Sequence, residues 1–385
     1  MIRYFYYHVF YVGMINIMMF VPTLLIRDRF HGAVSGMLVA IAISSVMSLV
    51  TMACFERFPG LGYPEISDLY LPRWLTKVNI LSAALFVWLP SGIIVLYSYA
   101  ETARMFFYPD MPPLVNLILL AGAAAWASCQ STRTVQFIQE IAMVLITPLI
   151  ILFLLKAITN ENMNWDAIRY VAGYVRIAPS FITIAASTFL FSGYMSLVLF
   201  NRMHEEGFKF KFRWVVPLFS SLFLAVTFFV PIGFHGTVGV QEYVYLWSMT
   251  ADSMALDYGF INRVLYVFLL MFTGISLLYV MNTWHTTIHF IRYTLNGYKS
   301  VEETPASRIN IWFSVGIGAA AFVYMYFIST EENQRVSEVW IITRFFVEIL
   351  TVFMMLYFVW RQKKSKSKNK PRAEAQSAAI GKAAE

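Results

Sequence analysis

Residues Thr188–Leu197 have the sequence Thr-Phe-Leu-Phe-Ser-Gly-Tyr-Met-Ser-Leu and lie in the middle of an apolar run between Ile177 and Asn201. A run of this length crosses a membrane as a helix. Gly193 weakens that helix, because glycine lowers helix stability by roughly 1 kcal/mol relative to alanine. Backbone that leaves a helix at bilayer depth must line a cavity or be buried in protein. Ser192-Gly193-Tyr194 is therefore either a helix break beside a site or a place where a second helix packs closely.

The composition of the chain predicts an integral membrane protein. Hydrophobic residues make up 59% of the 385 residues and charged residues only 13%, whereas a soluble domain carries about 25% charged residues. Apolar runs of roughly 20 residues recur along the chain, which indicates helices and not the alternating pattern of membrane strands. We expect an all-α integral membrane protein with about ten transmembrane helices and no cleavable signal peptide.

The expected spans follow one another with short loops between them. By apolar length they cover residues 4–26, 31–55, 77–100, 112–130, 135–157, 178–200, 214–234, 260–285, 309–329 and 338–360. We divide the chain into a transmembrane permease-like domain, residues 1–360, and a basic cytoplasmic tail, residues 361–385, that we expect to be disordered.

The basic charge of the chain is concentrated in this tail. Eight Lys or Arg and two Glu give residues 361–385 a net charge of +6, which leaves 7 − 6 = +1 for the rest of the chain. A basic segment directly after the last span is typical of a cytoplasmic anchor that also contacts anionic lipid. The net charge therefore does not indicate nucleic-acid binding. Together with the Lys and Arg of the loops, it predicts a multi-pass protein with both termini in the cytoplasm.

The number of spans predicts an internal repeat. Ten spans divide into two sets of five, and an odd number per set makes the second set inverted relative to the first, the LeuT-like arrangement. Span six then corresponds to span one, which carries Gly13 and Asn16. A matched pair of interrupted helices indicates the binding site of such a fold. We expect a midplane ligand site that includes Gly13, Asn16, Trp88, Phe191, Ser192, Gly193 and Tyr194.

The chemistry of two broken helices fits a zwitterion. A half-helix that begins at the break offers free N–H groups and partial positive charge, and one that ends there offers free C=O groups and partial negative charge. These ends suit the carboxylate and the ammonium of an amino acid. No charged side chain is then needed, which agrees with the absence of Asp, Glu, Lys and Arg near Gly13 and Gly193. Each nearby aromatic side chain, Trp88 and Phe191 included, is also explained by packing or lipid contact.

Several motifs resemble a known family. Arg57-Phe58-Pro59-Gly60-Leu61 follows span two, Ser131-Thr132-Arg133-Thr134-Val135 precedes span five, Ile138-Gln139-Glu140-Ile141 lies within span five, and Ser192-Gly193-Tyr194 interrupts span six. In this order they resemble the spore germination permease family, the B-type subunits of nutrient germinant receptors, in the amino acid–polyamine–organocation superfamily. The resemblance covers nearly the whole chain in length and span count.

The resemblance implies a fold, a ligand and partners. It implies five plus five inverted helices, with spans one and six unwound at the midplane. It also implies a free amino acid bound between these breaks and spans three and eight, and a complex with A- and C-type receptor subunits in a bacterial spore inner membrane. The family has a Gly-x-Gly-like pattern in span one, where this chain has only Gly13. Because larger side chains replace the second glycine of the pattern in span one, we expect this break to bind a different ligand or no ligand.

Polar residues in spans eight and ten are further candidates. Thr273 and Ser276 are plausible matches to the sodium-binding hydroxyls of the superfamily, although such hydroxyls often bond their own i−4 carbonyl. Glu348 follows Arg344 by four residues, so both lie on one helix face. Glu348 is either a proton carrier or part of a structural pair near the outer surface, with Arg344 reaching outward.

No motif indicates an enzyme, a cofactor or a metal. His285 and His289 have an i, i+4 spacing that suits a metal, but no third ligand accompanies them, and we expect an interfacial pair. The leading hypothesis is a receptor subunit that senses a solute. An amino acid secondary transporter coupled to protons or sodium is the alternative, and a channel or structural subunit is a third.

Overall fold

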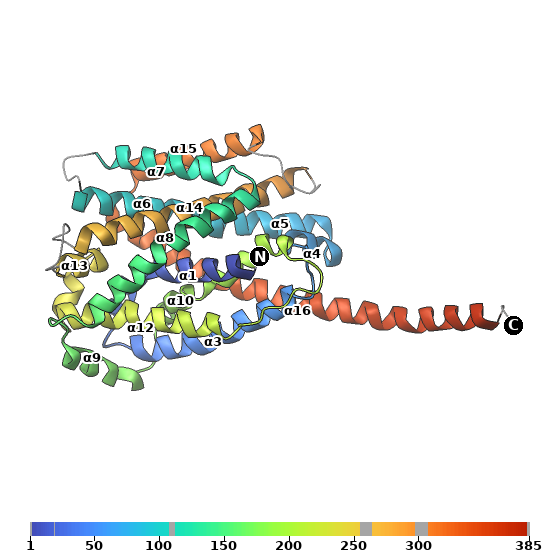
Figure 1. Cartoon of the computed structure of the whole chain (residues 1–385), viewed down its shortest axis with the longest axis horizontal. Coiled ribbons are helices and arrows are strands. Elements are labelled where there is room, and N and C mark those ends of the chain that lie inside the picture. Colours follow the sequence, from blue (N-terminus) through green and yellow to red (C-terminus); the bar gives the residue numbers. More distant parts are fainter. Residues whose placement is uncertain (1, 19, 108–111, 255–263, 297–306, 383–385) are drawn as a thin grey trace.

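The computed structural model describes residues 2–18, 20–107, 112–254, 264–296 and 307–382. Within these ranges every regular element is helical, and the helices form one bundle from which the last helix projects (Figure 1). Seven helices are long and apolar enough to cross a membrane, or nine when each of two bent helix pairs counts as one span. This is the architecture of a multi-pass membrane protein.

The long elements follow the expected order of spans. They are α1 (Ile2–Met18) and α2 (Phe20–Arg27), α3 (Ala33–Phe55), α5 (Arg73–Ala83) and α6 (Leu89–Phe107), α7 (Pro113–Ser128), α8 (Thr132–Ile158), α10 (Phe181–Phe189) and α11 (Leu197–Phe200), α12 (Val215–His235), α14 (Val264–Asn296), α15 (Arg308–Phe327) and α16 (Thr330–Lys382). Short helices in the connections are α4 (Tyr63–Tyr70), α9 (Trp165–Ala172) and α13 (Leu246–Asp252). The fourth segment is a shorter apolar helix, Leu114–Ser128. The ten-span inverted repeat stays a prediction.

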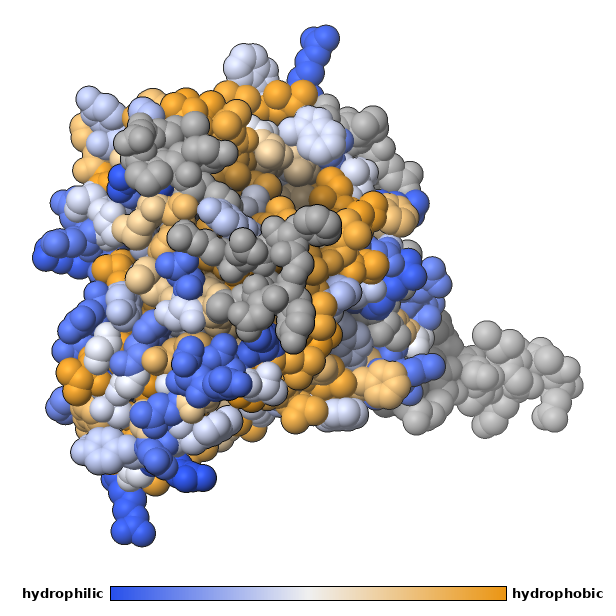
Figure 2. Space-filling view, turned by 60° about the vertical axis from the view of Figure 1, so that its left-hand side comes forward, coloured by the Kyte–Doolittle hydropathy of each residue, from blue (hydrophilic) through white to orange (hydrophobic). Residues whose placement is uncertain are grey.

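Large apolar side chains lie exposed on the outside of the bundle. Leu119 is 67% exposed, Trp312 75% and Phe327 72%. In Figure 2 hydrophobic side chains cover much of the upper part and the right flank of the visible face, and hydrophilic ones gather at the lower left. Contiguous apolar surface of this extent is what lipid requires and what water disfavours.

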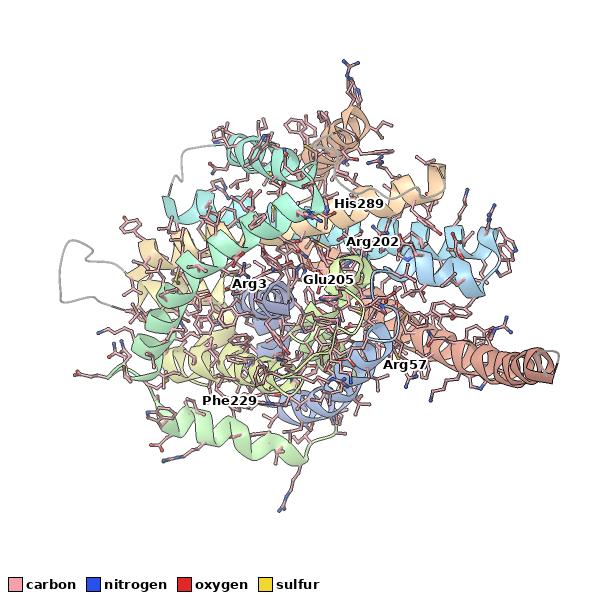
Figure 3. The ribbon with its side chains drawn as sticks, turned by 45° about the vertical axis from the view of Figure 1, so that its right-hand side comes forward. Arg3, Arg57, Arg202, Glu205, Phe229 and His289 are labelled. Atoms are coloured by element: carbon pink, nitrogen blue, oxygen red, sulfur yellow. The ribbon has the colours of Figure 1, made fainter. Side chains whose placement is uncertain are left out.

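The two ends of the bundle differ, and we name them by the chain segments that lie there. The tail end is the end from which α16 projects, and it also holds the start of α1, where the ring centres of Phe5 and Phe210 lie 4.7 Å apart. Figure 3 shows Arg57 beside the point where α16 leaves the bundle. The distal end is the opposite end, with Arg27 and the connection from α12 to α13.

Both helix breaks that the sequence suggested occur, but one is displaced. Phe181–Phe189 and Ser192–Met203 are bent by 59°, and a 3-10 turn, η3 (Ser192–Ser196), follows the bend. The predicted break in span six is therefore confirmed. In span one, α1 runs through Gly13 without interruption, and the 52° bend lies between Arg3–Asn16 and Phe20–Arg27. The prediction of an interruption at Gly13 is wrong, because the glycine serves close packing within a continuous helix.

The third span has an irregular segment before its proline. It begins at Arg73 and not at residue 77, and a π-helical turn, η1 (Ala84–Trp88), joins α5 to α6. Pro90 has no N–H to donate, so the helix around it cannot keep the regular α pattern. Trp340 of α16 donates its indole N–H to the carbonyl of Val87 at 3.0 Å, within this turn.

The expected disorder of the tail, residues 361–385, stays a prediction. Residues 361–382 continue α16 as helix away from the bundle (Figure 1), and residues 383–385 lie outside the described chain. Lys and Ala, which make up ten of the 22 residues 361–382, are strong helix formers.

Candidate functional site

A cavity of about 60 Å³ lies beside the break in span six, with the first half of span one as part of its wall. Side chains from α1, α6, α10, α14 and α16 contribute to its walls. Those that carry the argument below are His8, Tyr11, Trp88, Ser91, Phe189, Ser192, Tyr279, Trp340, Arg344 and Glu348. The volume exceeds the 10–15 Å³ that one water requires. The cavity therefore has room for more than one water molecule in the middle of the bundle.

An ion pair within the membrane forms one wall of this cavity. Arg344 and Glu348 are each 4% exposed and pair with one another. They lie near the middle of the apolar segment Thr330–Ser365. The expectation that Arg344 reaches outward near the outer surface is wrong, because helices packed against α16 cover both side chains.

Arg344 also stabilises the end of the broken helix α10. Its Nη2 donates to the carbonyl of Ala185 at 2.9 Å and to Oγ1 of Thr188 at 2.7 Å, and its Cζ lies 5.0 Å from the ring centre of Phe189. A cation at the C-terminus of a helix interacts favourably with its dipole. The expectation of a site without charged side chains is therefore wrong: a guanidinium occupies the carbonyl end of the break.

A hydrogen-bonded histidine forms the opposite wall. Gln139 donates from Nε2 to the carbonyl of Tyr4 at 3.1 Å, so its Oε1 faces Nδ1 of His8, 3.1 Å away. The hydroxyl of Tyr11 lies 2.6 Å from Nε2 of His8. This arrangement fits a neutral ring that donates from Nδ1 and accepts at Nε2. His8 belongs to no motif, and the one signal in the sequence is that an ionisable residue lies within a span.

Of the predicted ligand-binding residues, Trp88 and Ser192 line the cavity. Trp88 lies in the π-helical turn and packs edge-on against Phe290 at 6.5 Å between ring centres. Ser192 donates from Oγ to the carbonyl of Phe189 at 2.6 Å. Both side chains come from irregular backbone, which brings them to the cavity wall.

Gly193 lies where the two broken spans pack closely against one another. A Cβ atom at this position would lie 2.5 Å from Cα of Val9 and 3.2 Å from the carbonyl oxygen of His8. These are backbone atoms of α1 that cannot yield cheaply. The close-packing interpretation of this glycine therefore holds, and it is also what sets α1 against η3. Phe191 and Tyr194 are fully buried beside the break and are not among the lining residues.

Gly13 and Asn16 lie next to the cavity and do not line it. A Cβ on Gly13 would lie 2.4 Å from Cδ2 of Phe223. The missing side chain of Gly13 therefore lets α12 pack closely against α1. Asn16 donates from Nδ2 to the carbonyl of Val12 at 2.6 Å and to that of Phe189 at 3.5 Å. Asn16 thus joins the end of α1 to the end of α10.

The two candidate ion-binding hydroxyls lie on the continuous helix α14. Thr273 donates to the carbonyl of Leu269 at 2.7 Å, the i−4 alternative, and its hydroxyl also contacts that of Tyr99. Ser276 is buried. Neither residue is among those that line the cavity, so an ion site there stays a prediction.

The histidine pair of α14 is buried between helices, and its expected interfacial depth stays a prediction. His285 is 0% and His289 2% exposed. Nδ1 of His285 lies 2.8 Å from the carbonyl oxygen of Ser128, and Nε2 lies 3.1 Å from Oγ1 of Thr132. These bonds attach α14 to the connection between α7 and α8. Within the described ranges no group of three or more His, Cys, Asp or Glu could hold a metal ion.

Side chains and loop carbonyls close the tail end below the cavity. Asn201 donates from Nδ2 to the carbonyls of Phe58 at 2.7 Å and Leu61 at 2.8 Å, within the Arg-Phe-Pro-Gly-Leu motif. His204 lies 3.1 Å from Oδ1 of Asn201, and burial lowers the pKa of His204 to about 4. Arg202 pairs with Glu65 of α4 at 2.8 Å. The motif therefore supplies backbone carbonyls that fix the end of span six.

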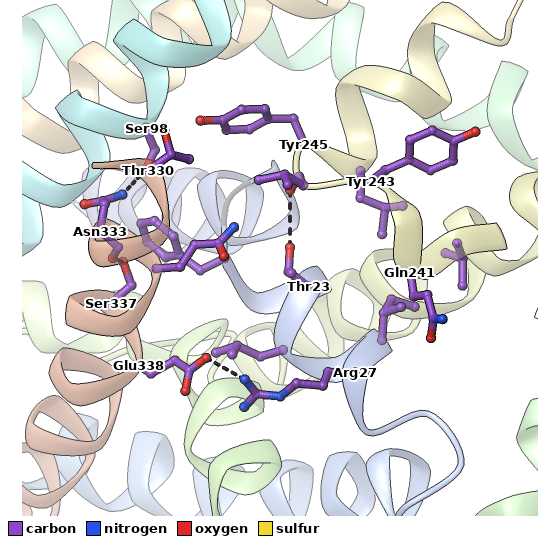
Figure 4. A pocket seen from close by; sticks show the side chains of 17 residues that line it. Thr23, Arg27, Ser98, Gln241, Tyr243, Tyr245, Thr330, Asn333, Ser337 and Glu338 are labelled. Carbon is purple, nitrogen blue, oxygen red and sulfur yellow. Dashed lines mark hydrogen bonds and ion pairs between the residues drawn. The ribbon is translucent and has the colours of Figure 1, made fainter. Parts of the chain in front are cut away.

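A second and larger pocket opens at the distal end (Figure 4). It has a volume of about 450 Å³ and lies between α2, α16, Ser98 of α6 and the connection from α12 to α13. Arg27 pairs with Glu338 across it at 2.6 Å. On α16 this pocket ends at Glu338 and the buried cavity begins at Trp340. The ring of Trp340 contacts that of Phe189 at 4.9 Å between ring centres, and both rings line the smaller cavity.

No protein-family model matches the chain, and no curated protein matches it.

Proposed function

We propose that this membrane protein binds a small dipolar solute, such as a free amino acid, in the buried cavity, and that it acts as the B-type, permease-like subunit of a nutrient germinant receptor. The observation that carries the solute site is the meeting of two broken helices at a cavity that contains an arginine–glutamate pair. The receptor role rests on the resemblance of the motifs, and the solute site rests on geometry.

The charges of the cavity favour a ligand without net charge. Arg344 and Glu348 lie side by side in low-dielectric surroundings and neutralise one another. A lone cation or anion would meet one charge of its own sign at short range, which is costly where water is excluded. A zwitterion can align its two charges with the pair, and the rings of Trp88 and Tyr279 complete the walls.

The second candidate is a proton-coupled transporter of the same solute. Glu348 supports it, because a buried carboxyl that lines a ligand cavity is the group that proton carriers use. Sensing and transport share the binding step and differ in whether the tail end opens. The contacts of Asn201 with the Arg-Phe-Pro-Gly-Leu loop fix the end of span six, and a transporter would have to release them to open that end.

The binding step is tested with purified full-length protein in lipid nanodiscs and labelled L-alanine, L-valine and L-asparagine. We expect saturable binding of at least one of them, and binding at least tenfold weaker in Glu348→Gln. Glu331→Gln is the matched control, since Glu331 is exposed on the same helix. Equal weakening in both variants, or binding unchanged in Glu348→Gln, would contradict the proposal.

The receptor role is tested separately from binding. Reconstituted into liposomes, a sensing subunit binds the solute without accumulating it, whereas a transporter accumulates it and responds to a proton gradient. Co-expression with A- and C-type receptor subunits should yield a stable complex. Solute uptake by the chain alone, with no complex formed, would favour the transporter.

A further inference from the structure

We propose that residues 208–214, which connect span six to α12, bind the headgroup of an acidic phospholipid. Their sequence is Phe-Lys-Phe-Lys-Phe-Arg-Trp, and we call this segment the Phe-Lys loop. No residue of the loop lines the cavity or the distal pocket, so the proposal is independent of the solute site proposed above. It rests on the charge of the loop, its exposed aromatic side chains and its position at the end of an apolar helix face.

The first half of the loop separates aromatic from basic side chains. Phe210 is buried, and its ring centre lies 4.8 Å from that of Phe208 and 4.7 Å from that of Phe5 of α1. Lys209 and Lys211 are exposed. Successive side chains of an extended segment point to opposite sides. The phenylalanines therefore attach the loop to the bundle, while the two lysines face outward.

A carboxylate fixes the backbone of the loop without neutralising its lysines. Glu56, at the end of α3, accepts from the backbone N–H of Phe210 at 2.6 Å and pairs with Arg213. Among the described residues, neither Lys209 nor Lys211 has an ion-pair partner. The loop thus holds two uncompensated cations in a position that Glu56 and the buried Phe210 determine.

The nearest acidic residues in the sequence lie before a turn. Glu205 and Glu206 precede Gly207, whose φ of 81° reverses the chain, and the N–H of Phe208 donates to the carbonyl of Glu205 at 3.2 Å. After this turn the loop contains three cations and no acidic residue. An anionic headgroup therefore meets a segment of purely positive charge.

The end of the loop indicates the depth of this charge in the membrane. Trp214 directly precedes α12, and Trp214, Leu218 and Leu222 follow one another at intervals of four residues on one face of the helix. Each of the three is more than half exposed, so this face meets lipid chains. Tryptophan prefers the boundary between lipid chains and headgroups. The two lysines, three and five residues before Trp214, are then expected at the level of the headgroups.

This arrangement matches an acidic phospholipid in both charge and shape. A lysine ammonium pairs with a phosphate as a point charge, and the indole of Trp214 suits the glycerol region between headgroup and chains. A zwitterionic headgroup brings a cation of its own, which the two lysines repel. A lysine beside an anionic membrane surface contributes about fivefold in binding.

The test uses full-length protein in phosphatidylcholine nanodiscs with a small fraction of photoactivatable lipid. The probe carries its reactive group in an acyl chain, and mass spectrometry of peptides measures labelling of residues 208–222 separately from labelling of the basic tail. We expect the phosphatidylglycerol probe to label residues 208–222 at least fivefold more than a phosphatidylcholine probe with the same chains. Equal labelling by the two probes would overturn the assigned headgroup.

Charge variants test the role of the lysines. Lys209→Gln with Lys211→Gln should lower labelling of residues 208–222 by the phosphatidylglycerol probe at least fivefold, and Lys209→Arg with Lys211→Arg should preserve it. Arg169→Gln with Arg176→Gln is the matched control, since it removes the same charge at exposed positions of another connection. Unchanged labelling in the glutamine variant, or an equal loss in the control, would overturn the site.

The aromatic anchor and the source of the phosphate are tested in the same assay. Trp214→Ala should lower labelling at least threefold, whereas Trp126→Ala, at an equally exposed tryptophan of α7, should not. Glycerol phosphate in solution should not compete, and displacement of the probe by it would assign the loop to a soluble anion. No labelling of residues 208–222 would assign this surface to a protein partner and overturn the proposal. Glu348→Gln should leave labelling unchanged, so failure of the solute site would not mimic failure here.

Discussion

Spans one and six both line the cavity, but their breaks are stabilised differently. At the end of α10 a charged side chain from another helix, Arg344, bonds the carbonyl of Ala185 and the hydroxyl of Thr188. At the end of α1 a local amide, Asn16, bonds the carbonyls of Val12 and Phe189. The break in span six thus depends on span ten, whereas the break in span one is stabilised mainly from within its own helix.

Their glycines differ in the same way. Gly193 faces backbone atoms of α1, which cannot move without separating the two broken spans. Gly13 faces a side chain, the buried ring of Phe223, and not backbone. A glycine beside a break is therefore not evidence that the backbone breaks there. The two glycines differ in whether the opposing atoms belong to backbone or to a side chain. Each prediction below changes a residue at the break in span one or at the break in span six.

The largest loss of unfolding free energy is expected when the Arg344–Glu348 ion pair is broken. Arg344→Leu leaves Glu348 buried without its partner, which costs about 3–5 kcal/mol of unfolding free energy. Arg335→Leu, at an exposed position of α16, should cost far less. The double variant Arg344→Leu with Glu348→Leu should recover most of the loss, since an apolar pair replaces a buried charge pair at little cost. Denaturant unfolding in bicelles measures all three, and equal stability of Arg344→Leu and Arg335→Leu would contradict the account.

A smaller effect is expected at the contact between the broken spans. Gly193→Ala places a Cβ 2.5 Å from Cα of Val9, and overpacking of this kind costs about 1–3 kcal/mol. Gly122→Ala is the control, because nothing lies within 4 Å of its added Cβ and alanine favours a helix. The same unfolding assay should rank Gly122→Ala at or above the wild type. A fully stable Gly193→Ala would show that α1 and η3 are not tightly apposed.

At the break in span one, we expect Asn16→Ala to lower the unfolding free energy by about 1 kcal/mol. Asn16→Ala removes one amide that joins α1 to Phe189, and a single buried hydrogen bond contributes about that much. Asn162→Ala, on an exposed connection, is the control and should be neutral. If Asn16→Ala were as costly as Arg344→Leu, the two breaks would not differ in the way described.

The smallest effect is expected at Gly13. In Gly13→Ala the new Cβ meets only the ring of Phe223, and alanine returns roughly 1 kcal/mol of helix stability. The unfolding free energy should therefore change by less than about 1 kcal/mol. Adding Phe223→Leu to Gly13→Ala should relieve any remaining clash. A loss as large as that of Gly193→Ala would place Gly13 at a rigid contact and contradict the distinction.

Apolar length was sufficient to predict the order of the helices, because each must bury its backbone polar groups within one segment. Ser192-Gly193-Tyr194 marked the break in span six correctly, since three weak helix formers coincide there. The prediction from Gly13 put the break in span one at the wrong position, because a single glycine serves close helix packing as readily as a helix break.

The charges of the cavity were the part that the sequence could not place. The spacing of Arg344 and Glu348 predicts a pair on one helix face, but their burial depends on α10, more than 150 residues away in the chain. Likewise, His8 becomes a cavity wall only because Gln139 of α8 bonds it. The polar chemistry of the distal pocket arises from four separate segments, none of which carries a motif.

The central claim is that a small solute binds where the two broken spans meet. Equilibrium binding of the labelled amino acids to Gly193→Leu and Gly122→Leu in nanodiscs tests it most directly, with correct membrane insertion of both variants verified first. We predict that Gly193→Leu, which forces α1 from η3, loses at least tenfold in affinity while Gly122→Leu binds as the wild type does. Unchanged affinity in a correctly inserted Gly193→Leu protein would contradict the account.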